Sequence, residues 1–182
     1  MEFNNRITKL LGVETPIVQA PMGWIARSQL ASAVCAGGGL GIIETSSGET
    51  DTCKAEIEKM FELTDAPFGV NLPIMFLKDD AMLTYICDSG VKFVTTSAGS
   101  PSKFIGPLKE AGIVVYHAVP TVEAAIRCVE AGIDGLVVEG GEGGGPEDER
   151  VAPARVRGPL AAGPAGGGSQ RLHKATEMES GD

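Results

Sequence analysis

Side chains that could do chemistry follow several short apolar runs along this sequence of 182 residues. The first run, residues 17–19, leads into Ala20-Pro21-Met22-Gly23, where Pro21 fixes the backbone angle φ and Gly23 permits close approach of the backbone. Met22 at the end of such a strand either lies against a flat aromatic cofactor or plugs the mouth of a barrel. Asn71 ends a later run, and its amide both donates and accepts hydrogen bonds. That suits either the polar edge of a flavin or another heterocycle, or a turn at the strand end.

The later runs are followed by further polar side chains. Residues 95–97 place three hydroxyl groups beside one run, where they either bind a ligand or cap the next helix. His117 is the only histidine before residue 146, and it is either a general acid or base near neutral pH or a structural residue bonded to a neighbouring loop. Residues 139–145 read EGGEGGG. This loop of bare backbone amides either wraps a cofactor, with Glu139 accepting a hydrogen bond from it, or is a flexible linker.

Two other patterns are better explained by structure than by chemistry. The glycine-rich segment 37–41 lies between a predicted helix and a predicted strand, the reverse of the order that phosphate-binding loops require. It therefore predicts the end of the helix and a tight entry into the strand. With only two histidines and no CxxC motif, the sequence predicts no metal site.

Composition places the chain among globular proteins of one ordinary domain. It is 43% hydrophobic and 21% charged, with a mean hydropathy of +0.09. A net charge of -9, with no cluster of Lys or Arg before residue 140, argues against nucleic acid as a partner. No apolar run reaches about 18 residues and the N-terminus has no secretory pattern, so we expect neither membrane nor secretion. Four widely spaced cysteines are typical of reduced, mostly buried thiols in a cytoplasmic protein.

The elements that position these groups alternate regularly. Short apolar, β-branched runs predict six strands, at residues 17–19, 40–43, 68–71, 92–96, 113–117 and 135–139. Helical spacing of apolar residues lies between them, at residues 51–63, 81–89, 102–111 and 121–131. Ser102 and Thr121 are predicted helix N-caps, and the predicted left-handed residues at helix ends are Gly90, Gly112 and Gly132.

Alternation of strands and helices predicts an α/β fold with a parallel sheet, and the continuous apolar strands predict burial on both faces. A repeating unit of about 23 residues fits either a doubly wound sheet or a (β/α)8 barrel. Polar residues follow nearly every strand, including residues 44–47, whereas a doubly wound sheet would gather them at one switch point. We therefore predict an incomplete (β/α)8 TIM barrel with about six of its eight strands.

Composition changes near residue 145, which divides the chain into residues 1–145, a partial barrel, and residues 146–182. The second segment contains no Ile, Phe, Trp or Tyr, and its many Gly, Ala and Pro residues follow no period. A segment so poor in apolar residues cannot offset the entropy cost of ordering, so we predict a disordered, low-complexity tail. Either this is a natural flexible tail or it is the product of a shifted reading frame, because GC-rich codons read out of frame yield Pro, Ala, Arg and Gly.

Five segments, in this order and at this spacing, resemble the nitronate monooxygenase family, formerly called 2-nitropropane dioxygenases. That family also includes flavin-dependent enoyl-acyl-carrier-protein reductases. The five segments are PIVQAPMG at residues 16–23, the stretch around GGLGII at residues 33–43, PFGVN at 67–71, VTTSAG at 94–99 and VEGGEGG at 138–144. The resemblance covers about residues 4–145.

The resemblance implies an FMN-dependent (β/α)8 barrel that oxidises alkyl nitronates with dioxygen and uses no metal. The matching positions are Ala20, Pro21, Met22 and Gly23 for the flavin ring and Asn71, Glu139 and Gly144 for the remaining cofactor contacts. Glu139 stands where many members carry Gln. A nitronate is electron-rich and oxidised flavin accepts electrons, so such a protein mainly has to stack and orient the two.

Two departures from the family pattern limit what this chain is expected to do. Pro146 stands where many members carry a histidine that acts as base or substrate ligand. Residues 146–182 have no equivalent of the last barrel strands, whose glycine-rich loops bind the FMN phosphate. We therefore expect poor FMN binding, little turnover, and unpaired barrel edges open to self-association. An enoyl-acyl-carrier-protein reductase of the same flavin family and a non-catalytic barrel fragment are the alternatives.

Overall fold

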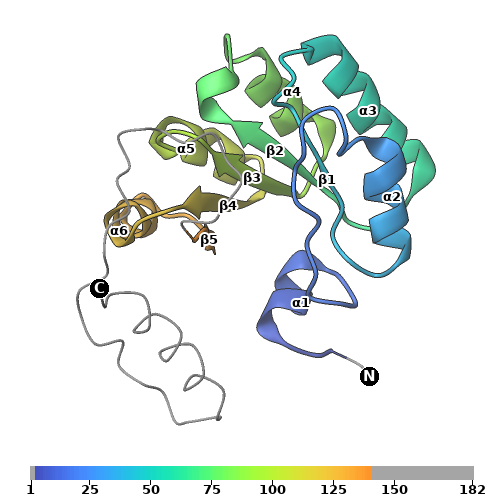
Figure 1. The fold of residues 1–182 in the computed structure, drawn as a ribbon, viewed down its shortest axis with the longest axis horizontal. Coiled ribbons are helices and arrows are strands. Elements are labelled where there is room, and N and C mark those ends of the chain that lie inside the picture. The colour runs from blue at the N-terminus through green and yellow to red at the C-terminus, as the bar shows by residue number, and fades with distance from the viewer. Residues whose placement is uncertain (1–2, 141–182) are drawn as a thin grey trace, which may run out of the picture. The chain divides into compact units, whose positions relative to one another are not determined.

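The computed structural model describes residues 3–140, and within them a parallel sheet is lined by helices (Figure 1). Its five strands lie in the order in which they occur in the sequence, and every neighbouring pair is parallel. The strands are β1 (Ile42–Ile43), β2 (Gly69–Pro73), β3 (Phe93–Ser97), β4 (Val114–Val119) and β5 (Gly135–Val138). The helices are α1 (Arg6–Leu11), α2 (Ser28–Ala36), α3 (Thr50–Leu63), α4 (Ala81–Ser89), α5 (Ser102–Glu110) and α6 (Val122–Glu130), with a short 3-10 helix, η1 (Ile74–Phe76). No helix of the described segment is both long and apolar enough to cross a membrane.

The alternation of strands and helices confirms the predicted α/β fold, and from residue 40 onward each predicted element matches an observed one to within two residues at each end. Thr121 caps α6 as predicted, because its hydroxyl accepts a hydrogen bond from the backbone N–H of Ala124. The predicted cap at Ser102 is wrong. Pro101 occupies the N-cap of α5, and the Ser102 hydroxyl lies 3.1 Å from that of Ser100 instead.

The first predicted strand is much shorter than expected. Only an isolated parallel bridge joins Val18 to Leu40. The side chain of Gln19 then hydrogen-bonds both backbone groups of Ile42. It accepts from the N–H and donates to the carbonyl oxygen, each at 3.2 Å. Pro21, two residues on, has no N–H with which to extend a ladder. The described sheet therefore has five strands where about six were predicted.

Helix α1 lies outside the predicted elements, although its start carries a recognisable signal. The side chain of Asn5 accepts hydrogen bonds from the N–H groups of Ile7 and Thr8, and the Thr8 hydroxyl accepts one from the N–H of Asn5. This reciprocal capping box satisfies donors that the first helical turn leaves free. Gly12, with φ of 69°, ends the helix in the left-handed conformation.

Successive residues of each strand face opposite sides of the sheet. One side, the helix-covered face, joins residues of α2 to α5 in a core that includes Val70, Leu72, Val94 and Val115. The other side, the inner face, is filled toward the N-terminal ends of the strands by a smaller cluster of Leu11, Leu40, Ile42 and Phe93. Phe93 also packs edge-on against Tyr116, with ring centroids 5.2 Å apart.

The glycine-rich segment 37–41 has the structural role predicted for it. Gly38 follows α2 in the left-handed conformation, with φ of 81°. A Cβ on Gly41 would overlap the backbone of Ala31 in α2, so the helix reaches this position beside β1 only because residue 41 is glycine. Close packing of helix on strand explains these glycines without a ligand.

All four cysteines are free thiols, as expected for reduced residues. Cys35, Cys53 and Cys128 are buried, and Cys87 is half-buried. Burial raises the pKa of each thiol above its ordinary value of 9.0, which keeps the groups protonated at neutral pH.

Gly135 in β5 lies directly beside the ring of Tyr116 in β4, and a Cβ at this position would overlap the ring. We predict that Gly135→Ala lowers the free energy of unfolding by about 1–3 kcal/mol, because the ring or the strand has to shift within a packed face. Denaturant unfolding followed by circular dichroism measures the change.

Gly37→Ala is the matched control. Gly37 ends α2 with φ of -81°, and a Cβ there would meet the carbonyl oxygens of Val34 and Ala33 at ordinary distances of 3.4 and 3.6 Å. We expect its free energy of unfolding to stay within about 0.5 kcal/mol of the parent value. If Gly135→Ala is as stable as Gly37→Ala, the ring does not rest against the glycine as described.

Candidate functional site

Asn71 lies at the centre of the candidate site, on the inner face of β2. Its side chain is 4% exposed, and its Oδ1 accepts a hydrogen bond from the Thr95 hydroxyl at 2.9 Å and a longer one from Ser97 at 3.5 Å. Both donors approach the oxygen, so the NH2 group of the amide is directed away from them. The amide is thus held by β3 and not by a strand-end turn, which leaves its NH2 group as a donor for a ligand.

The hydroxyl groups of Thr95 and Ser97 in β3 support Asn71 and do not cap α5. The register pairs Asn71 with Thr95 and Pro73 with Ser97, so both hydroxyls point to the inner face beside the amide. Of the two interpretations offered by the sequence, capping of the next helix is therefore excluded for Thr95 and Ser97. Together the three residues form a neutral polar row, which suits the edge of a heterocycle better than an ion.

The predicted cofactor-lining segment, Ala20 to Gly23, forms an accessible loop. Ala20 and Pro21 are exposed and the Met22 side chain is 37% exposed, so Met22 does not fill a core within the described residues. The Met22 carbonyl accepts hydrogen bonds from the N–H groups of Ile25 and Ala26, which closes the turn. A Cβ on Gly23 would lie 3.1 Å from the Ser46 hydroxyl oxygen, so this loop runs against the loop that follows β1.

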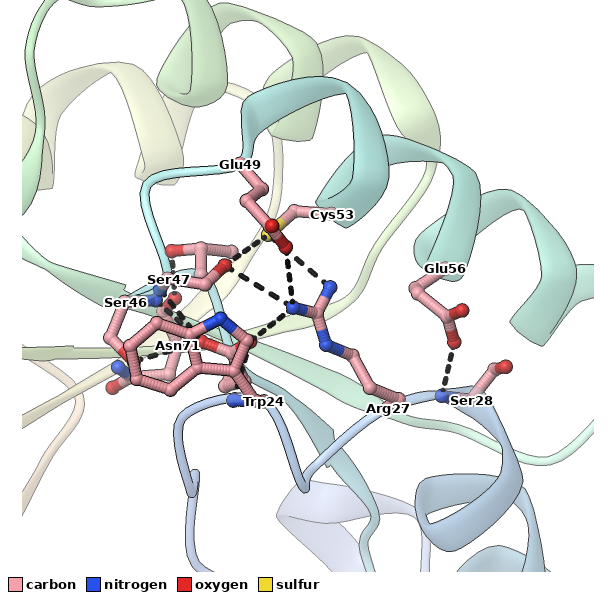
Figure 2. Close-up of polar contacts among 11 residues, drawn as sticks. Trp24, Arg27, Ser28, Ser46, Ser47, Glu49, Cys53, Glu56 and Asn71 are labelled. Carbon is pink, nitrogen blue, oxygen red and sulfur yellow. Dashed lines mark hydrogen bonds and ion pairs between the residues drawn. The ribbon is translucent and has the colours of Figure 1, made fainter.

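A buried carboxylate joins these two loops, at the place where Arg27 points toward Ser47 and Glu49 (Figure 2). Glu44, the first residue after β1, is 1% exposed and pairs with Arg27 at 3.0 Å. It also accepts hydrogen bonds from the backbone N–H groups of Trp24, Ser46 and Ser47. The sequence marks Glu44 only as a polar residue after a strand. Its link to Arg27 depends on the folded loop, and the only local sign is one arginine in an otherwise apolar stretch.

His117 lies on the opposite side of the sheet from Asn71. It pairs with Thr96, and its Nδ1 lies 2.7 Å from the Thr96 hydroxyl oxygen on the helix-covered face. The side chain is 5% exposed, and burial lowers its pKa below the usual 6.5 against the opposing effect of backbone hydrogen bonds. This geometry favours the structural interpretation of His117 over a role as general acid or base.

Glu139 is exposed and follows β5, where its N–H donates to the carbonyl oxygen of Val119 at 3.1 Å. It is thus at the same C-terminal end of the sheet as Asn71, but separated from it by β3 and β4. Gly144, the other residue predicted for that side, lies outside the described residues, as does the predicted tail. Both assignments to the cofactor stay predictions.

The described residues around Asn71 and the loop of residues 20–23 fit the ring of a flavin but supply no unpaired cation for its phosphate. A neutral polar row ending in Asn71 and an exposed loop with Met22 suit a flat ring that has an apolar face and a polar edge. The cation beside this loop, Arg27, is already paired with Glu44 and Glu49. A phosphate anchor is therefore not found around this loop.

Comparison with known proteins finds relatives that match most of this chain. The family model described as nitronate monooxygenase matches residues 4–83 and 77–154. A dehydrogenase of a hydroxy-methyl-oxo-octahydroindene carboxyl-CoA from Mycobacterium tuberculosis is 35% identical, over 80% of this chain and 41% of its own length. A nitronate monooxygenase from Paraburkholderia phytofirmans is 29% identical, over 75% of this chain and 48% of its own.

A solved structure confirms the fold. FabK from Thermotoga maritima superposes with a TM-score of 0.73 and 36% sequence identity, covering 76% of this chain and 44% of that chain. The chain thus spans about half the length, or less, of the relatives compared here. Its sheet is an incomplete (β/α)8 barrel.

The buried, neutral His117 predicts a pH dependence of stability. In the unfolded chain His117 has an ordinary pKa near 6.5, whereas in the folded chain burial lowers this pKa. Between the two pKa values the unfolded chain therefore binds more protons than the folded chain. The free energy of unfolding attributable to His117 is therefore fully present above pH 6.5 and falls as pH is lowered below it, by up to about 1.4 kcal/mol per pH unit. Denaturant unfolding between pH 7.5 and 5.5 measures this slope.

His117→Asn supplies the comparison, because Asn can still bond to the Thr96 hydroxyl but does not titrate in this range. We expect the slopes of unfolding free energy against pH to differ between the two proteins below pH 6.5. The contributions of all other titrating groups are the same in both proteins and cancel in the difference. Equal slopes in the two proteins contradict a buried neutral histidine.

Proposed function

This chain belongs to the nitronate monooxygenase family, and we propose that it oxidises alkyl nitronates with dioxygen through bound FMN. The observation that carries the proposal is the oriented amide of Asn71, with a free donor in a neutral polar row beside an exposed loop. When bound, FMN would supply the electron acceptance that no side chain of this row can provide.

The residues of the site have distinct proposed roles. The loop from Ala20 to Gly23 would lie along the flavin ring, with Met22 against its flat face. Asn71 would donate a hydrogen bond to an acceptor on the polar edge of the ring, with Thr95 keeping the amide in that orientation. Glu139 and Gly144 would close the remaining side.

Orientation, and not proton transfer by a side chain, is the contribution proposed for the described part of the site. The groups bonded to the Asn71 side chain are the hydroxyls of Thr95 and Ser97, and His117 faces the helices. A nitronate is already deprotonated, so its oxidation places little demand on a catalytic base. The described residues around Asn71 thus suit a substrate from which no proton has to be removed.

A second candidate function is reduction or dehydrogenation with NAD(P)H or NAD(P)+ as partner of the flavin. It is favoured by the 35% identity to the carboxyl-CoA dehydrogenase, which exceeds the 29% identity to the nitronate monooxygenase. The enoyl-acyl-carrier-protein reductase expected as an alternative from the sequence belongs to this second candidate.

Two assays with excess FMN separate the candidates. We expect an alkyl nitronate to drive slow but measurable oxygen consumption by the 182-residue chain, in line with the little turnover expected from its sequence, and NADH or NADPH to bleach the flavin more slowly still. Rapid anaerobic bleaching by NADH or NADPH, with no response to the nitronate, contradicts the first proposal and supports the second. Inactivity in both assays supports the alternative of a non-catalytic barrel fragment.

Flavin binding tests the proposal that this chain contacts the flavin ring but not the phosphate of FMN. We predict that the 182-residue chain binds FMN and lumiflavin, which lacks the phosphate, with weak affinities that agree within about threefold. The reason is that Arg27 is already paired and the expected phosphate loops have no counterpart in the resemblance. Fluorescence titration of each flavin measures both constants.

Asn71→Asp is the informative variant, because it keeps the oxygen that Thr95 bonds and removes the NH2 donor. We expect it to weaken binding of both flavins by about tenfold, the effect of one lost hydrogen bond to the ring. Purification of the parent chain with stoichiometric yellow FMN contradicts the predicted weak grip. Unchanged affinity in Asn71→Asp contradicts the role of Asn71.

Self-association is the second consequence proposed for an incomplete barrel. Four exposed apolar residues, here called the α6–β5 face, are Val122, Ile126 and Val129 of α6 and Val138 of β5, which are 53% to 78% exposed. The three residues of α6 recur at helical spacing and so share one side of that helix. We predict concentration-dependent oligomers of the chain by sedimentation velocity, with the double variant Ile126→Lys, Val129→Lys shifted toward monomer.

Glu123→Lys is the control for added positive charge, because Glu123 lies on α6, is exposed and contributes no apolar area to the α6–β5 face. It should associate like the parent chain. A parent chain that is monomeric at all accessible concentrations contradicts the prediction.

A further inference from the structure

The carboxylate of Glu44 uses its two oxygen atoms for two different loops. Its Oε1 accepts a hydrogen bond from the N–H of Trp24 at 3.1 Å and receives the Arg27 guanidinium at 3.0 Å. Its Oε2 accepts from the N–H and hydroxyl of Ser46, at 2.7 and 2.8 Å, and from the N–H of Ser47 at 3.1 Å. This one side chain, which is 1% exposed, therefore joins the loop before α2 to the loop after β1.

The loop before α2 needs such a support at Trp24. Trp24 has φ of 59°, a left-handed conformation that is costly for any residue with a Cβ. Its side chain is 68% exposed, so packing of the indole does not hold the backbone there. The backbone is held by the turn that the Met22 carbonyl closes and by the bond from the N–H of Trp24 to Glu44. The N–H of Glu44 donates in turn to the carbonyl oxygen of Ala26 at 3.0 Å.

Arg27 makes the burial of this carboxylate tolerable. A buried charge without a partner is strongly unfavourable, and the guanidinium supplies the opposite charge. Arg27 also reaches the Ser47 hydroxyl and the Glu49 carboxylate, each at 3.3 Å. Glu49, however, is 52% exposed and accepts no backbone N–H from the loop before α2 among its hydrogen bonds within the described residues. The two acidic partners of Arg27 thus differ in whether they touch that loop.

We propose that Glu44 is a positioning residue that holds the loop of residues 20–25 in the conformation in which it lines the cofactor. The role of that loop rests on the proposed function, whereas the contact with Glu44 does not. A carboxylate is required, because it accepts at both oxygens. In Glu44→Gln the amide NH2 would face either the N–H of Trp24 or the N–H groups of Ser46 and Ser47, so one loop is always released.

Trp24 allows a direct test, because it is the single tryptophan of the chain. Time-resolved fluorescence anisotropy of the 182-residue protein reports motion of this loop without any ligand. We expect Glu44→Gln to increase the amplitude of the nanosecond depolarisation and Glu49→Gln to match the parent. A Glu44→Gln variant that lowers thermal stability but leaves the anisotropy decay unchanged overturns the proposal, because Glu44 would then act on the fold alone.

Titration with lumiflavin connects the loop to the cofactor. We expect Glu44→Gln to bind lumiflavin at least tenfold more weakly than the parent, and Glu49→Gln to bind within twofold of it. A looser loop with unchanged lumiflavin affinity overturns the cofactor part of the proposal. If the parent itself binds no lumiflavin, the proposed function fails, while the anisotropy result still decides whether Glu44 holds the loop.

Amide hydrogen exchange keeps the test available if Glu44→Gln does not fold. In the parent chain the N–H groups of Trp24, Ser46 and Ser47 all end on Glu44. We expect all three to exchange at least tenfold more slowly than unstructured peptide amides. Exchange of the Trp24 amide at the unprotected rate overturns the proposal.

Discussion

The two-residue alternation of side chains along parallel strands decides what each polar residue of this molecule can do. Asn71 pairs with Thr95, and Thr95 with Tyr116, so the three residues lie in one row on the inner face. The next row, one residue further along each strand, contains Thr96 and His117 and faces the helices. A shift of one residue in register would exchange the rows, burying the amide under the helices and turning the histidine toward the site.

Packing between glycine and aromatic residues supports the observed register. Gly69 lies beside Phe93, where a Cβ would approach the ring to 2.6 Å, and Gly135 lies beside Tyr116 in the same way. Phe93 and Tyr116 therefore each have a glycine as register partner on a neighbouring strand. A one-residue slip would place a branched side chain, such as Val70, against the ring instead. Residues that contact no ligand thus determine where the ligand-binding residues point.

Local patterns predicted what local interactions determine. Apolar periodicity located the strands from residue 40 onward, and helix-end glycines such as Gly90 are left-handed as expected. Asn71 was recognised because it ends a strand. The orientation of His117 was not predictable, because it depends on the register between strands rather than on its own neighbours. The pair of Arg27 and Glu44 was missed for the same reason, since a loop folding back over 17 positions creates it.

The incomplete barrel separates two requirements of the proposed cofactor that a closed barrel would meet together. The described residues offer contacts for a flat ring, whereas Arg27, the cation beside that loop, is committed to Glu44 and Glu49. A barrel that binds phosphate does so in the loops of its later strands, and the strands and helices of that part of the barrel would also pack against the α6–β5 face. The same later part of a closed barrel would therefore both cover Ile126 and supply the phosphate contacts. Association of two copies of this chain would bury the apolar face but leave Arg27 paired in each copy, so we expect oligomerisation alone to leave the affinity for the proposed flavin unchanged.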